Sequence, residues 1–223
     1  MQFDIISLFP GMFDGPFSTS MLKKAQDKNL VEINFHQLHD FGFDERGTVD
    51  DSPYGGGKGM ILKVDVVDKA ITEVRSQKSE ARSKVILLSP KGKRLTQDKV
   101  VELASNFDHL ILLCGHYEEF DERIRQNLVD EDISIGDFVL TGGEIPAMAL
   151  VDSVSRLIPG VLAAGSATDE SFMQKDESGD FLLEYPQYTR PEIYKDWPVP
   201  EVLLSGNHAE IEKWRQNERK KAS

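Results

Sequence analysis

The segment Val85-Ile86-Leu87-Leu88-Ser89-Pro90-Lys91-Gly92 joins a continuous apolar run to a break that contains proline and glycine. The same pattern returns further along the chain, where a predicted helix over 96–104 precedes the apolar run 109–113 and the break Cys114-Gly115-His116-Tyr117. Short apolar strands that alternate with helices are typical of a parallel sheet covered on both faces. The sequence therefore predicts an α/β protein.

The segments on either side extend this pattern. Strands are predicted over 2–8, 31–37 and 133–141, and amphipathic or apolar helices over 63–77, 121–128 and 144–157. From 159 to 179 small, polar and acidic residues replace the pattern, which predicts a linker or loop. Asn207 and Glu210 have the spacing of a capping box and predict a final helix.

Composition limits the classes of protein that the chain can form. Its 223 residues, 39% of them hydrophobic, can bury one substantial core and a small additional piece. The single cysteine, Cys114, excludes an intramolecular disulfide framework and fits a reducing compartment. The chain contains no apolar run of the roughly 18 residues that a membrane span needs and no signal-like start, so we expect a cytoplasmic protein without membrane contact.

The charge distribution bears on nucleic-acid binding. A formal net charge of −12 argues against a broad basic surface for RNA. Basic residues nevertheless gather in two places, which allows a local basic face. These residues are Lys91, Lys93 and Arg94 in the first group and Lys213, Arg215, Arg219, Lys220 and Lys221 in the second.

Several motifs have ordinary structural interpretations. The glycine cluster 54–59 differs from a phosphate-binding P-loop because Gly59 follows Lys58 where serine or threonine is needed, so a turn near a ligand or partner is favoured. His36 and His39 have no accompanying carboxylate or cysteine set, which favours structural over metal-binding histidines. Cys114 ends an apolar run, as expected of a small buried thiol.

Three breaks lie at or after successive predicted strands, at 88–92, 114–118 and 134–143. The carboxyl ends of parallel strands are where ligands collect, and three converging breaks could enclose an adenosine. Spacing alone does not separate such a site from ordinary loops. Composition likewise leaves open whether Arg156, near a helix end, and the acidic pair Asp169-Glu170 have more than a structural role.

The combination of motifs resembles the bacterial tRNA (guanine-N1)-methyltransferases, which belong to the SPOUT class of knotted methyltransferases. The likeness covers nearly the whole chain. It includes Ile5-Ile6-Ser7-Leu8-Phe9-Pro10, Thr48-Val49-Asp50-Asp51, Pro53-Tyr54-Gly55-Gly56-Gly57, Leu88-Ser89-Pro90, Asp121-Glu122-Arg123, 134–146, 152–160, Tyr188-Thr189-Arg190-Pro191 and 203–209.

The resemblance implies a parallel sheet flanked by helices, with a deep C-terminal trefoil knot that binds S-adenosylmethionine. It implies a knotted domain over 1–160, a flexible linker or active-site loop over 161–180 and a small, mostly helical tRNA-binding domain over 181–223. It also implies a homodimer with the active site at the subunit interface. The cofactor contacts that it implies are Leu88, Ser89, Pro90, Gly115, Tyr117, Glu118, Ile135, Gly136, Asp137, Phe138, Val139, Leu140, Gly142, Gly143 and Pro146.

The implied activity is methyl transfer to N1 of the guanosine immediately 3′ of the anticodon in tRNA, which maintains the reading frame. A carboxylate can accept the N1 proton while an arginine stabilises the negative charge that develops on O6. Arg156 matches the arginine, and Glu170 stands where the family has its aspartate base, with Asp169 as the alternative. The expected RNA contacts are Asp50, Tyr54, Tyr188, Arg190, Lys213 and Arg215.

The chain departs from the family pattern at several positions. Glu119 replaces a glycine beside the expected cofactor pocket, and the tail ends soon after Trp214-Arg215. Ser52 and Lys58 stand where arginine and proline are common. These departures leave a catalytically silent homologue that binds S-adenosylmethionine and RNA as the alternative function, and a related enzyme that acts on another RNA as a second alternative. Family members also respond to Mg²⁺, although the sequence contains no dedicated metal site.

Overall fold

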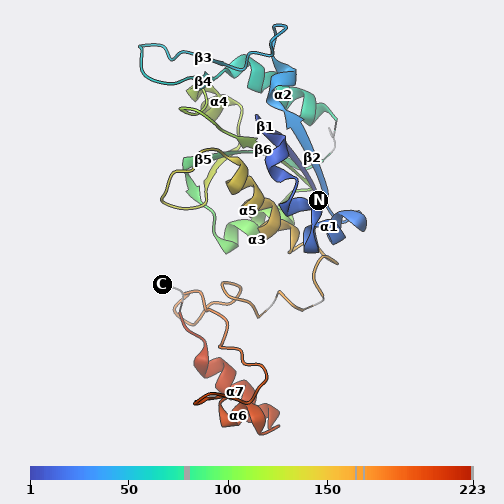
Figure 1. Cartoon of the computed structure of the whole chain (residues 1–223), viewed down its shortest axis with the longest axis vertical. Helices are drawn as coiled ribbons and strands as arrows, with labels where there is room; N and C mark the ends of the chain where they lie inside the picture. Colours follow the sequence, from blue (N-terminus) through green and yellow to red (C-terminus); the bar gives the residue numbers. More distant parts are fainter. Residues whose placement is uncertain (78–80, 164, 168, 222–223) are drawn as a thin grey trace. The chain divides into compact units, whose positions relative to one another are not determined.

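The computed structural model describes residues 1–77, 81–163, 165–167 and 169–221 (Figure 1). The chain forms two compact units, Met1–Leu162 and Ala163–Ser223.

The first unit is built on a five-stranded sheet in the order β2-β1-β6-β5-β7. All neighbouring strands are parallel, which confirms the α/β prediction. The strands are β1 (Gln2–Ser7), β2 (Glu32–Gln37), β5 (Ser83–Arg94), β6 (His109–Cys114) and β7 (Glu131–Ser134). Strands β1 and β6 are buried along their whole length, as expected for strands covered on both faces.

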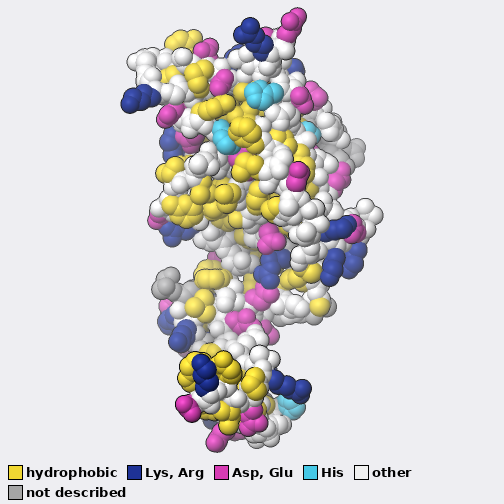
Figure 2. All heavy atoms as spheres, viewed as in Figure 1, with side chains coloured by type: hydrophobic (Ala, Val, Ile, Leu, Met, Phe, Trp, Pro, Cys, Tyr) yellow, Lys and Arg dark blue, Asp and Glu magenta, His cyan; other side chains and the backbone are white. Residues whose placement is uncertain are grey.

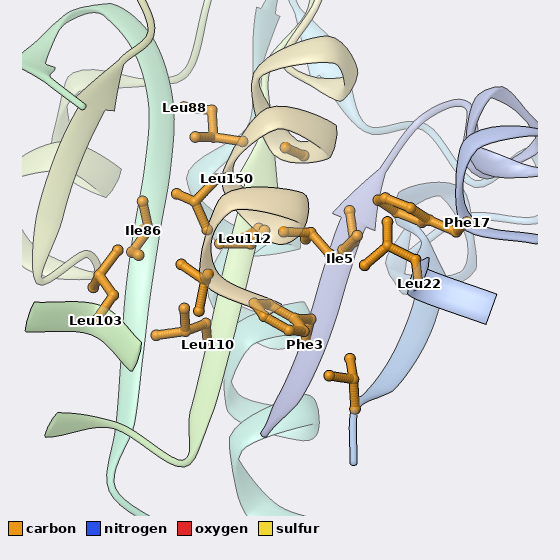
Figure 3. Packing of buried hydrophobic residues seen from close by; sticks show 14 of the residues in the cluster. Phe3, Ile5, Phe17, Leu22, Ile86, Leu88, Leu103, Leu110, Leu112 and Leu150 are labelled. Atoms are coloured by element: carbon orange, nitrogen blue, oxygen red, sulfur yellow. The ribbon is translucent and has the colours of Figure 1, made fainter. Parts of the chain in front are cut away.

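Helices cover both faces of this sheet. One face packs against α1 (Ser20–Asp27), α3 (Gln97–Asn106) and α5 (Glu144–Ser155), and the other against α2 (Val64–Ser76), α4 (Glu122–Asn127) and η3 (Leu38–Phe41). The alternation of side chains along β5 serves both cores. Ile86 and Leu88 enter the first core (Figure 3), whereas Val85 and Leu87 enter the second.

The helix starts follow from local capping. The Thr96 hydroxyl accepts a hydrogen bond from the Lys99 amide, and the Asp121 carboxylate accepts one from the Arg123 amide at 2.9 Å. Such caps satisfy amides that the first helical turn leaves without partners. The predicted helices over 63–77, 96–104, 121–128 and 144–157 are confirmed by α2, α3, α4 and α5.

Two of the predicted boundaries in the sheet are wrong. The break at 89–92 does not end its strand, because β5 continues to Arg94 and both Leu88 and Lys93 pair with Ile133. The predicted strand over 133–141 ends at Ser134. The Ser134 hydroxyl donates to the Gly136 carbonyl and accepts from the Gly136 amide, and these local bonds replace the strand ladder.

Shorter elements complete the first unit. They are η1 (Pro10–Phe13), η2 (Pro16–Ser18), β3 (Asp50–Asp51) and β4 (Ile61–Leu62). The glycine cluster between β3 and β4 forms a turn, in which Gly55, Gly56, Gly57 and Gly59 all have positive φ. This confirms the turn interpretation of the cluster over the P-loop one.

The second unit contains the hairpin β8 (Ile193–Tyr194) and β9 (Trp197–Pro198), followed by α6 (Glu201–Leu204) and α7 (His208–Glu218). The Asn207 side chain accepts hydrogen bonds from the Ala209 and Glu210 amides, so the predicted start of the final helix is confirmed. Among the described residues of this unit, no hydrophobic side chain is fully buried. In the described parts of the whole chain, no helix combines the length and apolar character needed to cross a membrane.

Candidate functional site

A pocket of about 300 Å³ lies beside residues 88–91 of β5, at the carboxyl ends of β6 and β7 and beside the first turn of α5. The three predicted breaks form most of its wall, because parallel strands bring their carboxyl ends to one edge of the sheet. The lining residues are Leu88, Ser89, Pro90, Lys91, Gly115, His116, Tyr117, Glu118, Glu119, Ile133, Ser134, Ile135, Gly136, Phe138, Val139, Leu140, Thr141, Gly142, Gly143 and Pro146.

The pocket brings together every predicted cofactor contact except Asp137. The Asp137 carboxylate instead forms an ion pair with Arg94. Glu119, expected beside the pocket, also lines it, together with residues that were not among the predicted cofactor contacts, which are Lys91, His116, Ile133, Ser134 and Thr141. Their position within or beside the three breaks was the available signal, but it could not show which side chains face inward.

Glycines allow the backbone segments around the pocket to approach one another. The Gly143 amide donates a hydrogen bond to the Gly115 carbonyl at 2.9 Å, and a Cβ on Gly143 would lie 2.6 Å from the Cys114 Cα. Any side chain at Gly143 would therefore collide with neighbouring backbone. The residue type at this position is fixed by the close crossing of two chain segments.

The loop 115–119 has an unusual backbone conformation. Tyr117 has φ of 60° and Glu119 has φ of 117°, both in the region that favours glycine. The Leu62 amide donates to the Glu119 carbonyl at 3.1 Å, and the Glu118 amide donates to the Met60 carbonyl at 3.2 Å. The loop is therefore held by backbone bonds to the segment that follows the glycine cluster.

The surroundings of Tyr117 shift the pKa of its phenol. Burial raises the pKa of Tyr117, and the nearby Asp50 carboxylate raises it further through its charge and a hydrogen bond. Both effects favour the neutral phenol, since ionisation would place a second negative charge beside Asp50. Asp50, an expected RNA contact, thus lies next to a pocket residue.

Glu119 is the centre of a charged cluster on the pocket wall. Its carboxylate is bonded to the Ser89 hydroxyl and the Lys91 ammonium, and Arg125 of α4 lies at 2.9 Å. Burial alone raises the pKa of the Glu119 carboxyl, but the bonds from Lys91 and Ser89 outweigh it and hold that pKa below its ordinary value. The charge that the sequence places beside the pocket is therefore neutralised locally.

A second carboxylate is buried beneath the pocket. The side chain of Glu144, in the first turn of α5, has no exposed surface. One of its oxygens accepts a hydrogen bond from the Ser7 hydroxyl at 2.6 Å, and the other lies 2.8 Å from Nε2 of His116. This network joins the end of β1, the loop after β6 and the start of α5.

The predicted catalytic residues lie in both units. Arg156 is the C-cap residue of α5 in the first unit and is half-buried. Asp169 and Glu170 belong to the second unit. The exposed Asp169 carboxylate accepts a hydrogen bond from the side-chain amide of Gln174 at 2.8 Å, and Glu170 is half-buried.

The expected RNA contacts are mostly exposed. In the first unit, Tyr54 is fully exposed at the tip of the glycine turn. In the second unit, Arg190 and Lys213 are exposed, Tyr188 lies 6.3 Å from Trp214 between ring centres, and the Arg215 guanidinium lies 5.0 Å above the Tyr185 ring. Tyr54, Tyr188, Arg190 and Lys213 are therefore exposed to solvent, whereas Asp50 and Arg215 are half-buried.

The histidines and the cysteine outside these sets have structural roles. Nε2 of His36 lies 2.6 Å from the buried Asp4 carboxylate, and Nδ1 of His39 lies 2.8 Å from the Gly47 carbonyl. Burial, together with the charge of Glu144, raises the pKa of the Cys114 thiol well above its ordinary value. Across the described ranges, no cluster of three or more histidine, cysteine or acidic side chains could hold a metal ion.

The fold and the pocket together define a parallel α/β protein whose ligand pocket is built from three glycine-containing segments at one edge of the sheet. A family model described as tRNA (guanine-1)-methyltransferase TrmD matches residues 1–223, and the chain belongs to this family.

Curated relatives agree with that assignment. Proteins named tRNA (guanine-N(1)-)-methyltransferase are 50% identical in Dehalococcoides mccartyi and 52% identical in Citrifermentans bemidjiense, each over 218 residues. A relative with the same name in Chloroflexus aggregans is 49% identical over 219 residues. Each match covers 98% of this chain and 85%, 84% and 83% of the respective relative. The resemblance inferred from the motifs is thereby confirmed.

Proposed function

We propose that this protein transfers a methyl group from S-adenosylmethionine to N1 of the guanosine immediately 3′ of the anticodon in tRNA. The observation that carries the proposal is the pocket, which gathers the cofactor contacts expected of the family at one sheet edge. The relatives' names support the base and the atom that are methylated. The methyl donor and the position of the guanosine in tRNA belong to the proposal.

The pocket residues fit this donor. Apolar side chains such as Leu88, Ile133 and Pro146 offer a surface for a flat adenine ring, and the glycines expose backbone amides and carbonyls. The Glu118 carboxylate suits a ligand that carries positive charge on its sulfonium and amino groups. When bound, S-adenosylmethionine supplies an electrophilic methyl group on sulfur.

Glu170 or Asp169, together with Arg156, supplies the remaining groups that methyl transfer needs. Guanine N1 becomes a good nucleophile as its proton leaves, so a carboxylate must accept that proton. Glu170 is the preferred acceptor and Asp169 the alternative, because Glu170 occupies the family's base position. Arg156 stabilises the negative charge that spreads to O6 during proton loss. Among the described residues, no cluster of histidine, cysteine or acidic side chains supports a Mg²⁺ site.

The pocket loops are proposed to form the deep trefoil knot of the SPOUT class. Ile133 of β7 pairs with two residues of β5, Leu88 and Lys93. A residue in a strand can do this because its backbone has two edges that form hydrogen bonds. Such pairing is expected where the intervening chain passes around the end of β7. A Cβ on Gly92 would lie 2.5 Å from the Ile133 amide nitrogen, so glycine is needed for that close passage.

The protein is further proposed to act as a homodimer in the cytoplasm, with tRNA bound across the subunit interface. Figure 2 shows hydrophobic side chains gathered on the face of the first unit that carries α5. Exposed apolar residues of this unit include Phe9, Met12, Phe138, Val139 and Ile145. A contiguous apolar surface of this kind favours association with a second copy.

Two alternatives remain as outcomes of the test. A silent homologue would bind donor and RNA without turnover, and it is not favoured because the relatives are named as enzymes. A related enzyme acting on another RNA would methylate a different nucleotide. Mapping the methylated position separates this alternative from the proposal.

The deciding experiment measures methyl transfer to an anticodon stem-loop that carries the guanosine. Glu170→Gln should lower kcat by about 100-fold or more, because general-base catalysis contributes about 10²–10⁴-fold. Asp169→Asn should change kcat little, and Glu177→Gln, in an exposed acidic position of the same segment, is the matched control. Tight donor binding by the wild-type protein without any turnover would instead establish the silent homologue.

A further inference from the structure

The pocket wall rests on a buried polar network that no predicted role uses. His116 lines the pocket, and its Nε2 atom lies 2.8 Å from a Glu144 carboxylate that is completely removed from solvent. The second oxygen of Glu144 is occupied by the Ser7 hydroxyl at 2.6 Å. A buried carboxylate is costly unless both oxygens are hydrogen-bonded, so Glu144 requires a donor from His116.

This requirement fixes the imidazole in one position. With Nε2–H donated to Glu144, the neutral ring keeps its lone pair on Nδ1, so the carboxylate selects the tautomer. The Phe9 ring packs against the imidazole in an edge-to-face arrangement, with ring centres 4.8 Å apart. A Cβ on Gly142 would lie 2.4 Å from Nε2, so the imidazole can occupy this position only because residue 142 has no side chain.

The loop that carries His116 needs such an anchor. His116 lies between Gly115 and Tyr117, and the backbone at Tyr117 and Glu119 has positive φ. Non-glycine residues in this region are strained and persist only where the surroundings hold them. The bond to Glu144 ties the middle of this loop to the start of α5.

We propose that His116 is a positioning residue for the methyl-donor pocket, held by Glu144 so that the loop 115–119 is already in its binding conformation before the donor arrives. The inference rests on the proposed function, since it assumes that the pocket takes a sulfonium nucleoside. Loss of the bond should release the loop and lower donor affinity without changing the affinity for tRNA.

The test compares three variants by calorimetric titration with S-adenosylmethionine and S-adenosylhomocysteine, below the melting temperature of each variant. His116→Leu removes the donor to Glu144 and should raise the Kd for both nucleosides at least about ten-fold. His116→Gln restores an N–H donor and should recover most of the affinity. His36→Leu is the matched control, because it removes a histidine from another buried carboxylate, Asp4, outside the pocket.

A double-mutant cycle with Glu144→Gln completes the design. If Glu144 acts through His116, adding Glu144→Gln to His116→Leu should cause little further loss of affinity. Unchanged nucleoside affinity in His116→Leu, or an equal loss in His36→Leu, would overturn the inference. Absence of nucleoside binding by the wild-type protein would instead overturn the proposed function.

Discussion

At the scale of single residues, the main departure from the family pattern is Glu119, whose carboxylate is bound by neighbouring side chains. Glu119 stands where the family has glycine, and its φ of 117° is a glycine conformation. Ser89, Lys91 and Arg125 bind its carboxylate. The side chain therefore gains ion pairs at a position where the backbone is strained.

The energetic effect of the Glu119 ion pairs can be measured separately from that of the strained backbone. Glu119→Gly and Glu119→Ala lose the same ion pairs, but only glycine relieves the strained φ. We expect the alanine variant to be about 1 kcal/mol less stable than the glycine variant in urea unfolding. Equal stability of the two variants would show that the backbone at this position is not strained.

At the scale of elements, a buried charge links the central strands. Asp4 of β1 has Oδ1 2.6 Å from His36 of β2 and Oδ2 2.6 Å from His109 of β6. Burial raises the pKa of Asp4, but the hydrogen bonds from His109, His36 and Gln2 outweigh it and hold that pKa far below its ordinary value. The three adjacent strands therefore share one ionised carboxylate.

Removing this charge should weaken the sheet. Asp4→Asn is expected to lower the free energy of unfolding by about 3 kcal/mol at pH 7, because it disrupts a buried charged network. Asp27→Asn, which disrupts an exposed ion pair with Lys23, should change it by less than about 0.5 kcal/mol.

The pH dependence gives a second check. Because the folded-state pKa of Asp4 lies below its unfolded value, the ionised group stabilises the fold above about pH 4. That contribution is lost as the pH falls through the folded-state pKa. The stability difference between wild type and Asp4→Asn should therefore narrow below about pH 4, and a difference that stays constant in acid would contradict the assignment.

At the scale of the whole molecule, the two units differ in how they are stabilised. The first unit has two apolar cores, one on each face of its sheet. Among its described residues, the second unit has no fully buried hydrophobic side chain, and it holds Lys221 to Asp176 and Asp180 by ion pairs. Arg156 belongs to the first unit and Glu170 to the second, and we propose that each active site of the proposed homodimer takes them from different subunits.

Subunit mixing tests this arrangement. Arg156→Ala and Glu170→Gln should each be nearly inactive as homodimers. A purified heterodimer of the two variants should recover about half of the wild-type activity, since one of its two sites receives both native residues. An inactive heterodimer would mean that each site takes Arg156 and Glu170 from the same subunit. If Asp169 proves to be the base, Asp169→Asn takes the place of Glu170→Gln.

The sequence by itself determined the α/β class and most of the strands and helices. These features depend on local patterns, such as the apolar run 85–88 and the capping residues Thr96 and Asn207, which act within a few positions along the chain. Motif likeness also supplied the family, which the whole-chain match confirms.

Only the tertiary structure decided how distant segments meet. It continued β5 past Ser89, because Lys93 finds a partner in Ile133, and it paired Arg94 with Asp137. It also joined Ser7, His116 and Glu144 beneath the pocket, although Ser7 and Glu144 are 137 positions apart. Such contacts depend on the path of the chain through space, and no periodicity or spacing along the sequence records that path.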